Sequence, residues 1–180
     1  MIPSTQAHTM SPETSKAPNQ PPATPPPPAP APSAPAPEPA APHALSHLPL
    51  PLRAVDYTLK GYHLEATVEP AQVAFAAEQL DGEGFSLDTI TGVDWLAEGQ
   101  MEVVYDYFHP AQPLRVVVRT RVPRAEPELP TISTVFPGAN WHERETHDFF
   151  GIRFAGHPNL TPFLLPEDAT YHPLRKDFTS

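Results

Sequence analysis

Cysteine is absent from the 180 residues of this chain. Its absence excludes disulfide bonds, thiolate zinc sites, cysteine-ligated iron–sulfur clusters and cysteine nucleophiles. The sequence also lacks a run of about 20 apolar residues, the length that spans a bilayer. Residues 1–6 carry neither the cationic nor the apolar stretch of a signal peptide. We therefore expect a cytoplasmic chain with no direct membrane insertion.

Positive charge is scarce, because 11 Lys and Arg residues stand against 21 Asp and Glu residues, for a formal net charge of −10. Binding to phosphate backbones needs a cationic surface, so this balance argues against nucleic acid as a partner. It argues equally against direct docking on anionic lipid. The partners that remain are other proteins and small molecules.

Glycine is missing from residues 1–52, which hold 17 of the 28 prolines. Such a segment has too few large apolar side chains to offset the entropy of ordering it. We expect 1–52 to be a disordered Pro/Ala-rich tail, 53–154 to be one folded domain, and 155–180 to be an extended arm that binds a partner. This last segment is called the C-terminal arm below.

The middle of the chain predicts a small α+β domain. We expect a mixed or antiparallel sheet with helices on one face. Strands are predicted within 57–68 and over 85–95, and helices from Pro70 to about 81–84, over 131–136 and over 141–150. Thr131 and Asn140 are the predicted caps of the last two helices, and Gly151 is the predicted stop of the last one.

The clearest pattern is an antiparallel hairpin between Met101 and Val122, in which apolar and polar residues alternate. A four-residue loop at 110–113 would pair His109 with Leu114. The same register places Tyr105 opposite Val118, and Glu102 opposite Arg121. We expect one apolar face and one charged face, whose arginines pair with Glu102 and Asp106 instead of forming an anion site.

Two catalytic interpretations of residues 142–148 fail on spacing. A zinc-protease helix needs histidines at i and i+4, whereas His142 and His147 are five residues apart, about 140° around a helix. Glu143 and Glu145, at i and i+2, point away from each other and cannot share a proton. A metal-dependent hydrolase using His142, His147, Glu143 and Asp148 stays open as a third hypothesis, to be decided by metal analysis.

A structural role suits this charged helix better, because Arg144 and Asp148 are spaced to pair, as are Glu143 and His147. Its aromatic residues lie at both ends, which is typical of a helix held between partners. The segment after Gly151 contains four prolines and many apolar residues. Those residues cap the domain's own core or bury on a neighbour, and we expect burial on a neighbour for the later ones.

Three blocks of the sequence resemble one known family. They are Glu143-Arg144-Glu145-x-x-Asp148-x-x-Gly151-Ile152-x-Phe154-x-Gly156-His157-Pro158, then Leu165-Pro166-Glu167-Asp168, then His172-Pro173-Leu174-Arg175-Lys176-Asp177. In this order they are similar to the thirty-kilodalton subunit family of NADH-quinone oxidoreductase, which is respiratory complex I. The resemblance covers roughly residues 55–178. Related small subunits of energy-converting membrane-bound nickel–iron hydrogenases share the first block and are the alternative.

The resemblance implies a non-catalytic subunit on the cytoplasmic side of the bacterial cell membrane. It would carry no cofactor or metal, since NADH, FMN, the iron–sulfur clusters and quinone belong to other subunits. It would pack against the large quinone-site subunit, which forms the quinone pocket with a cluster-bearing subunit. The residues predicted to contact a partner are Glu143, Arg144, Glu145, Asp148, Arg153, His157, His172, Arg175, Lys176 and Asp177.

Overall fold

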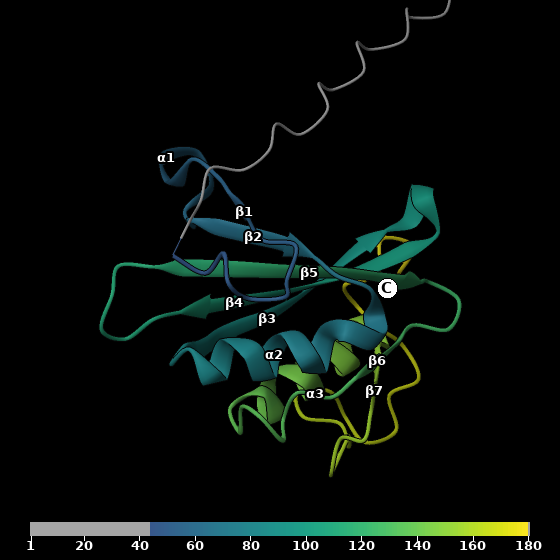
Figure 1. Ribbon diagram of the computed structural model, residues 1–180. Helices are drawn as coiled ribbons and strands as arrows, with labels where there is room; N and C mark the ends of the chain where they lie inside the picture. Colours follow the sequence, from purple (N-terminus) through teal and green to yellow (C-terminus); the bar gives the residue numbers. More distant parts are fainter. Residues whose placement is uncertain (1–43, 180) are drawn as a thin grey trace, which may run out of the picture. The chain divides into compact units, whose positions relative to one another are not determined.

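The computed structural model describes residues 44–179 (Figure 1). Residues 1–43 of the predicted tail lie outside the described residues. Residues 44–52, the last nine of the predicted tail, belong to the folded domain, since Leu45 and Leu52 are only 5% and 8% exposed. The predicted end of the tail at residue 52 is therefore wrong. Leu48 and Leu50 pack against the same core. Four leucines in eight positions supply enough apolar surface to hold this stretch on the domain.

A mixed sheet of five strands, in the order β1-β2-β5-β4-β3, forms the framework of the fold. Only β2 and β5 run parallel, and the other neighbours are antiparallel. The strands are β1 (Arg53–Ala54), β2 (Leu64–Thr67), β3 (Ser86–Trp95), β4 (Gln100–Phe108) and β5 (Arg115–Pro123). The α+β fold class predicted from the sequence is confirmed.

The β4–β5 hairpin has the predicted register. Tyr105 lies opposite Val118 and Glu102 opposite Arg121, and the His109 N–H donates to the Leu114 carbonyl at 2.9 Å. The face with Tyr105 is the buried face. On the other face the arginines pair with acids as expected. Arg115 lies 3.0 Å from Asp106, and Arg121 lies 3.8 Å from Glu102.

The first helical segments differ in part from the prediction. The strand predicted within 57–68 is β2. It is preceded by a short helix that was not predicted, α1 (Tyr57–Lys60), which Asp56 caps through the Thr58 N–H and Gly61 ends at φ 78°. A short 3-10 turn, η1 (Pro70–Gln72), leads into α2 (Val73–Gly82), so the predicted helix beginning at Pro70 is confirmed. A second such turn, η2 (Leu96–Glu98), joins β3 to β4.

The helix predicted over 131–136 is wrong, and those residues form a turn. The N–H groups of Val135 and Phe136 both donate to the Ile132 carbonyl, at 3.0 and 2.9 Å, and Pro137 then prevents the turn from continuing as a helix. The Glu143 carboxylate accepts the Ile132 N–H at 2.7 Å and the Thr131 hydroxyl. α3 (Ala139–Phe150) begins earlier than expected, so Asn140 lies inside it instead of capping it. Gly151 ends α3 in the left-handed region, as predicted, at φ 72°.

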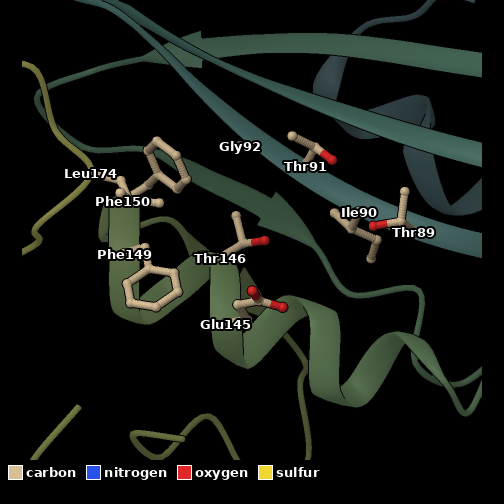
Figure 2. A pocket seen from close by; sticks show the side chains of 9 residues that line it. All are labelled: Thr89, Ile90, Thr91, Gly92, Glu145, Thr146, Phe149, Phe150 and Leu174. Carbon is tan, nitrogen blue, oxygen red and sulfur yellow. The ribbon is translucent and has the colours of Figure 1, made fainter. Parts of the chain in front are cut away.

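α2 and α3 lie on the same side of the sheet (Figure 1). The end of α3 packs directly under β3, where the Phe150 ring lies against Gly92 (Figure 2). A Cβ at position 92 would come within 2.5 Å of that ring. Glycine at this position therefore lets α3 approach the strand closely.

A second, two-stranded parallel sheet joins β6 (Glu128–Pro130) to β7 (Arg153–Ala155). Neither strand was predicted from the sequence, and β7 crosses the predicted boundary between the domain and the C-terminal arm at 154/155. Leu129 and Phe154 pair in this sheet and are 1% and 2% exposed. Among the described residues, no helix combines the length and the apolar character needed to cross a membrane.

Candidate functional site

The C-terminal arm is fastened to its own domain through Asp148 of α3. One carboxylate oxygen of Asp148 accepts the backbone N–H groups of Phe163, Leu164 and Leu165 at 2.8, 2.7 and 3.2 Å. Burial opposes the charged carboxylate, but these three donors hold the pKa of Asp148 below its ordinary value. Asp148 therefore fixes the backbone of residues 163–165 and does not offer its side chain to a partner.

The C-terminal end of α3 binds the next part of the arm. A helix leaves its last carbonyls without partners, and here the arm supplies them. The His172 Nδ1–H donates to the Asp148 carbonyl at 2.8 Å, and Arg175 Nε donates to the Phe150 carbonyl at 2.7 Å. The Leu174 N–H reaches the Phe149 carbonyl at 3.2 Å. Arg175 therefore binds the end of a helix of its own domain, and its contact with a partner stays a prediction.

A third anchor, Asp94, was missed by the sequence analysis. Its side chain is 1% exposed and accepts from Arg124 at 2.8 and 3.0 Å. It also accepts the Lys176 N–H at 2.8 Å, while Arg124 donates to Asp177 at 2.5 Å. The Arg124 hydrogen bonds, helped by the Lys176 N–H, lower the pKa of Asp94 despite its burial. A charged residue on the core-facing side of a predicted strand was the available signal.

Arg144 links α3 to the arm without touching Asp148, so the predicted Arg144–Asp148 pair does not form. Its guanidinium donates to the carbonyls of Thr161 and Pro162 at 3.0 and 2.8 Å. It lies 5.2 Å from the Trp141 ring centroid and 5.0 Å from that of Phe163. Cation–π contact of this kind positions both aromatic rings at the surface.

With its backbone held, the arm leaves large apolar side chains exposed. Phe154 is buried and Leu160 packs on the domain's own core. Six of the ten exposed large apolar side chains of the described residues lie at the start of α3 or in the arm. They are Trp141 54%, Phe163 41%, Leu164 53%, Tyr171 44%, Leu174 53% and Phe178 38% exposed. We call these six residues the apolar arm surface.

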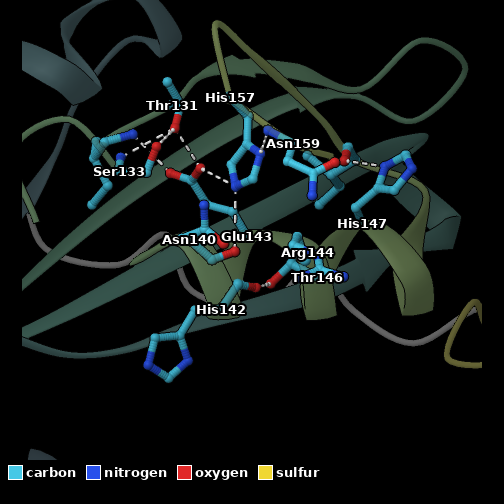
Figure 3. A network of polar contacts seen from close by, with 12 residues as sticks. Thr131, Ser133, Asn140, His142, Glu143, Arg144, Thr146, His147, His157 and Asn159 are labelled. Carbon is cyan, nitrogen blue, oxygen red and sulfur yellow. Dashed lines mark hydrogen bonds and ion pairs between the residues drawn. The ribbon is translucent and has the colours of Figure 1, made fainter. Parts of the chain in front are cut away.

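The Glu143 side chain is completely buried. It lies in a network of polar contacts with Thr131 and His157 (Figure 3). It lies 3.8 Å from Nε2 of His157, whose side chain is also buried. His157 Nδ1 accepts the Asn159 N–H, so Nε2 carries the proton and donates to the Asn140 carbonyl at 3.3 Å. Burial raises the pKa of Glu143 to about 7 and lowers that of His157. Glu143 joins α3 to Thr131 and Ile132, and His157 joins the start of the arm to α3.

The ten predicted contact residues therefore divide into two groups. Eight of them make contacts within this chain. Two are buried carboxylates, one is a histidine with a buried side chain, and five hold the arm. They are Glu143, Asp148, His157, Arg144, His172, Arg175, Lys176 and Asp177. Arg153 is exposed and pairs with Glu128. The Glu145 carboxylate makes no hydrogen bond or ion pair within residues 44–179.

The residues of the hydrolase hypothesis are not gathered into one site. The His142 side chain points away from Glu143 (Figure 3). His147 donates to the Ile152 carbonyl at 2.9 Å, and Asp148 is occupied by the arm. Within residues 44–179, no group of three or more His, Asp or Glu side chains could hold a metal ion.

Known proteins resemble this chain in sequence and in fold. A family described as "Respiratory-chain NADH dehydrogenase, 30 Kd subunit" matches residues 66–180. A relative from Roseiflexus castenholzii, one of the subunits of an NADH-quinone oxidoreductase, is 47% identical over 92 residues, 51% of this chain and 53% of that protein. The corresponding subunit of Moorella thermoacetica is 36% identical over 122 residues, 66% of this chain and 82% of its own length. The matched stretch thus spans about half of the first relative.

A solved structure shows the same fold. It is a chain of the membrane-bound sulfane sulfur reductase, an archaeal respiratory membrane complex, with a TM-score of 0.60 and 30% sequence identity. The likeness covers 64% of this chain and 71% of that chain.

Proposed function

Since this chain belongs to the family of the respiratory-chain NADH dehydrogenase 30 Kd subunit, we propose that it is a non-catalytic subunit of a proton-translocating NADH-quinone oxidoreductase. Its role is to scaffold the large quinone-site subunit, next to the cluster-bearing subunit, while electrons pass from NADH to quinone. It sits on the cytoplasmic side of the cell membrane and is held there through the complex. The names of its relatives support this proposal.

The observation that carries the proposal is the apolar arm surface. Polar anchors at Asp94, Asp148 and the end of α3 hold the backbone of the arm, while its large apolar side chains face outward. Exposed apolar groups on a fixed backbone are what a permanent protein partner buries, because little entropy is lost on binding. The large quinone-site subunit is the partner that this surface suits.

The test uses a tagged full-length chain purified from membranes of its own host. We expect the amount of the large quinone-site subunit that co-purifies to fall about tenfold or more in the double variant Leu164→Ser, Leu174→Ser. The reason is that two leucines no longer bury against that subunit. Both leucines are 53% exposed, so the melting temperature of the isolated chain should hardly change. Leu59→Ser, at a position 81% exposed on α1, is the matched control. Full retention of the large partner in the double variant would refute the proposal.

A related membrane complex is the second candidate, because the fold also occurs in the sulfane sulfur reductase. A nickel–iron hydrogenase of the energy-converting type belongs to the same alternative. The material that co-purifies with the tagged chain separates the candidates. NADH-driven quinone reduction supports the first, and hydrogen evolution or sulfur reduction without NADH oxidation supports the second.

A further inference from the structure

The outer edge of β3 is a second surface, which meets the apolar arm surface at Leu174. β3 is the last strand of the sheet and spans ten residues, Ser86–Trp95. Edge strands of natural proteins are usually short, or carry proline, lysine or covering segments that prevent pairing. Residues 86–93 hold no proline and a single charge, Asp88. Their one irregularity is the register shift between Leu87 and Thr89.

The ladder shows which peptide groups of β3 face outward. The bond from the His109 N–H to the Leu114 carbonyl places the odd-numbered peptide groups of β4 toward β5. The even-numbered groups, including those of Asp106 and Val104, therefore face β3. These two residues lie opposite Thr89 and Thr91, so Thr89 and Thr91 bond to β4.

The peptide groups of Ile90 and Gly92 must then point away from β4, because direction alternates along a strand. Within residues 44–179, no further hydrogen bond is made by either of these peptide groups. A pair of adjacent outward peptide units, two residues apart, is the pattern to which an added strand binds.

A cavity of about 200 Å³ lies along this edge (Figure 2). Thr89, Ile90, Thr91 and Gly92 form its strand side. The apolar rings of Phe149 and Phe150 and the side chain of Leu174 line the opposite side, and Glu145 stands beside them. Unlike the acids of the sheet, Glu145 has no cation within the described part of the chain.

We propose that the free edge of β3 and this cavity, called the β3 edge groove, bind an extended segment of a partner protein as a sixth strand. The chemistry of the groove specifies the segment. Its backbone bonds to the peptide groups of Ile90 and Gly92, and an apolar side chain enters between Phe149 and Phe150. A lysine or arginine of the segment pairs with Glu145.

Two other occupants fit less well. Residues 1–43 of this chain contain 15 prolines, and proline lacks the N–H that strand pairing requires. A second copy of the chain would bring its own Asp88 and Glu145 to the groove, so that acid would face acid. A basic strand of a different protein is the occupant that the groove favours.

The test compares backbone hydrogen exchange, residue by residue, in the isolated full-length chain and in the complex that co-purifies with it. Strand addition should slow the amides of Ile90 and Gly92 at least tenfold on assembly. The amides of Thr89 and Thr91, already bonded to β4, should change little. Equal slowing of all four amides, or no slowing of Ile90 and Gly92, would overturn the proposal, since only an added strand protects alternate residues.

The charge is tested by Glu145→Lys, with Glu78→Lys on the exposed side of α2 as the control of equal charge. Both variants should fold, as measured by circular dichroism and melting temperature. We expect Glu145→Lys to reduce the chain's recovery in the complex by about tenfold, and Glu78→Lys to leave it unchanged. Equal recovery of the two variants would eliminate the basic partner. Leu174 belongs to both surfaces, whereas Leu164 lies outside the groove. Leu164→Ser alone therefore tests the proposed function, and Glu145→Lys tests this inference.

Discussion

Glu143 and Asp148 are two buried carboxyl groups on α3. Their surroundings shift their pKa values in opposite directions. Asp148 receives three backbone N–H groups and keeps a lowered pKa. Glu143 receives one N–H and one hydroxyl, which do not offset its burial, so its pKa rises to about 7. Deeper burial outweighs the two donors at Glu143, whereas three donors outweigh a shallower burial at Asp148, so Asp148 is the carboxyl that stays charged near neutral pH.

Glu143→Gln should change how stability depends on pH. A carboxyl whose pKa rises from 4.5 in the unfolded chain to about 7 in the folded one binds its proton more tightly when folded. Its stabilising contribution is complete below pH 4.5 and is lost as the pH rises through 7. The loss is about 3 kcal/mol. Urea unfolding at pH 5 and pH 8 should show this loss in the natural chain and not in the variant.

The control for this prediction is Glu145→Gln, a change of the same type at a carboxyl with no partner in the described residues. It should leave the pH dependence of the natural chain intact. If Glu143→Gln also retains that dependence between pH 5 and pH 8, the carboxyl is already ionised in the folded state and the raised pKa is refuted.

At the scale of elements, the end of α3 and the arm form one unit. Gly151 stops the helix at φ 72°, and the arm then returns so that His172 and Arg175 bind the last carbonyls. The arm therefore acts as the cap of α3. Its exposed leucines and aromatics are held in place before any partner arrives.

Gly151→Ala should loosen this unit. An alanine in the left-handed region costs about 1 kcal/mol. Its Cβ would also lie 2.5 Å from His172 Nε2 and 2.7 Å from Arg175 Nη2, which displaces the arm. We expect a total loss of about 2–3 kcal/mol. The measurement is urea unfolding, combined with limited proteolysis across residues 170–178.

Gly99→Ala supplies the matched comparison, because Gly99 has φ 65° and no atom within 4 Å of the added Cβ. It should show the backbone cost alone, with the arm still resistant to proteolysis. Equal losses in the two variants, with no new cleavage in the arm, would mean that the arm does not depend on contact with Gly151.

At the scale of the whole molecule, the core is built from segments far apart in the chain. Leu45 and Leu52 before the sheet, Tyr105 within it and Phe154 after it all belong to the same buried cluster. The domain therefore begins before the Pro/Ala-rich composition ends. This boundary matters for any truncated form of the chain.

Truncation tests that boundary. A chain of residues 44–180 should be as stable as the full chain, because Leu45 and the leucines after it are kept. A chain of residues 53–180 should lose about 2–5 kcal/mol, the value of two buried leucines and their partly buried neighbours. Thermal unfolding of the two chains measures the difference. Equal melting temperatures would place residues 44–52 outside the stable core.

The local pattern of the sequence determined the family signature, the hairpin register and the end of α3. Alternation fixes which residues of β4 and β5 share a face, and glycine alone tolerates the backbone of position 151. These features depend on neighbours in the chain. The excess of acid and the absence of cysteine likewise needed no structure.

Only the tertiary structure decided what the charged residues do. Glu143 bonds to Thr131, Asp148 to residues 163–165, and Asp94 to Arg124 and Lys176, partners up to 82 positions away. Helical spacing predicted nearer partners for α3, because it cannot show that the chain returns to the helix. The free edge of β3 is also a property of strand order, which depends on the packing of the whole sheet.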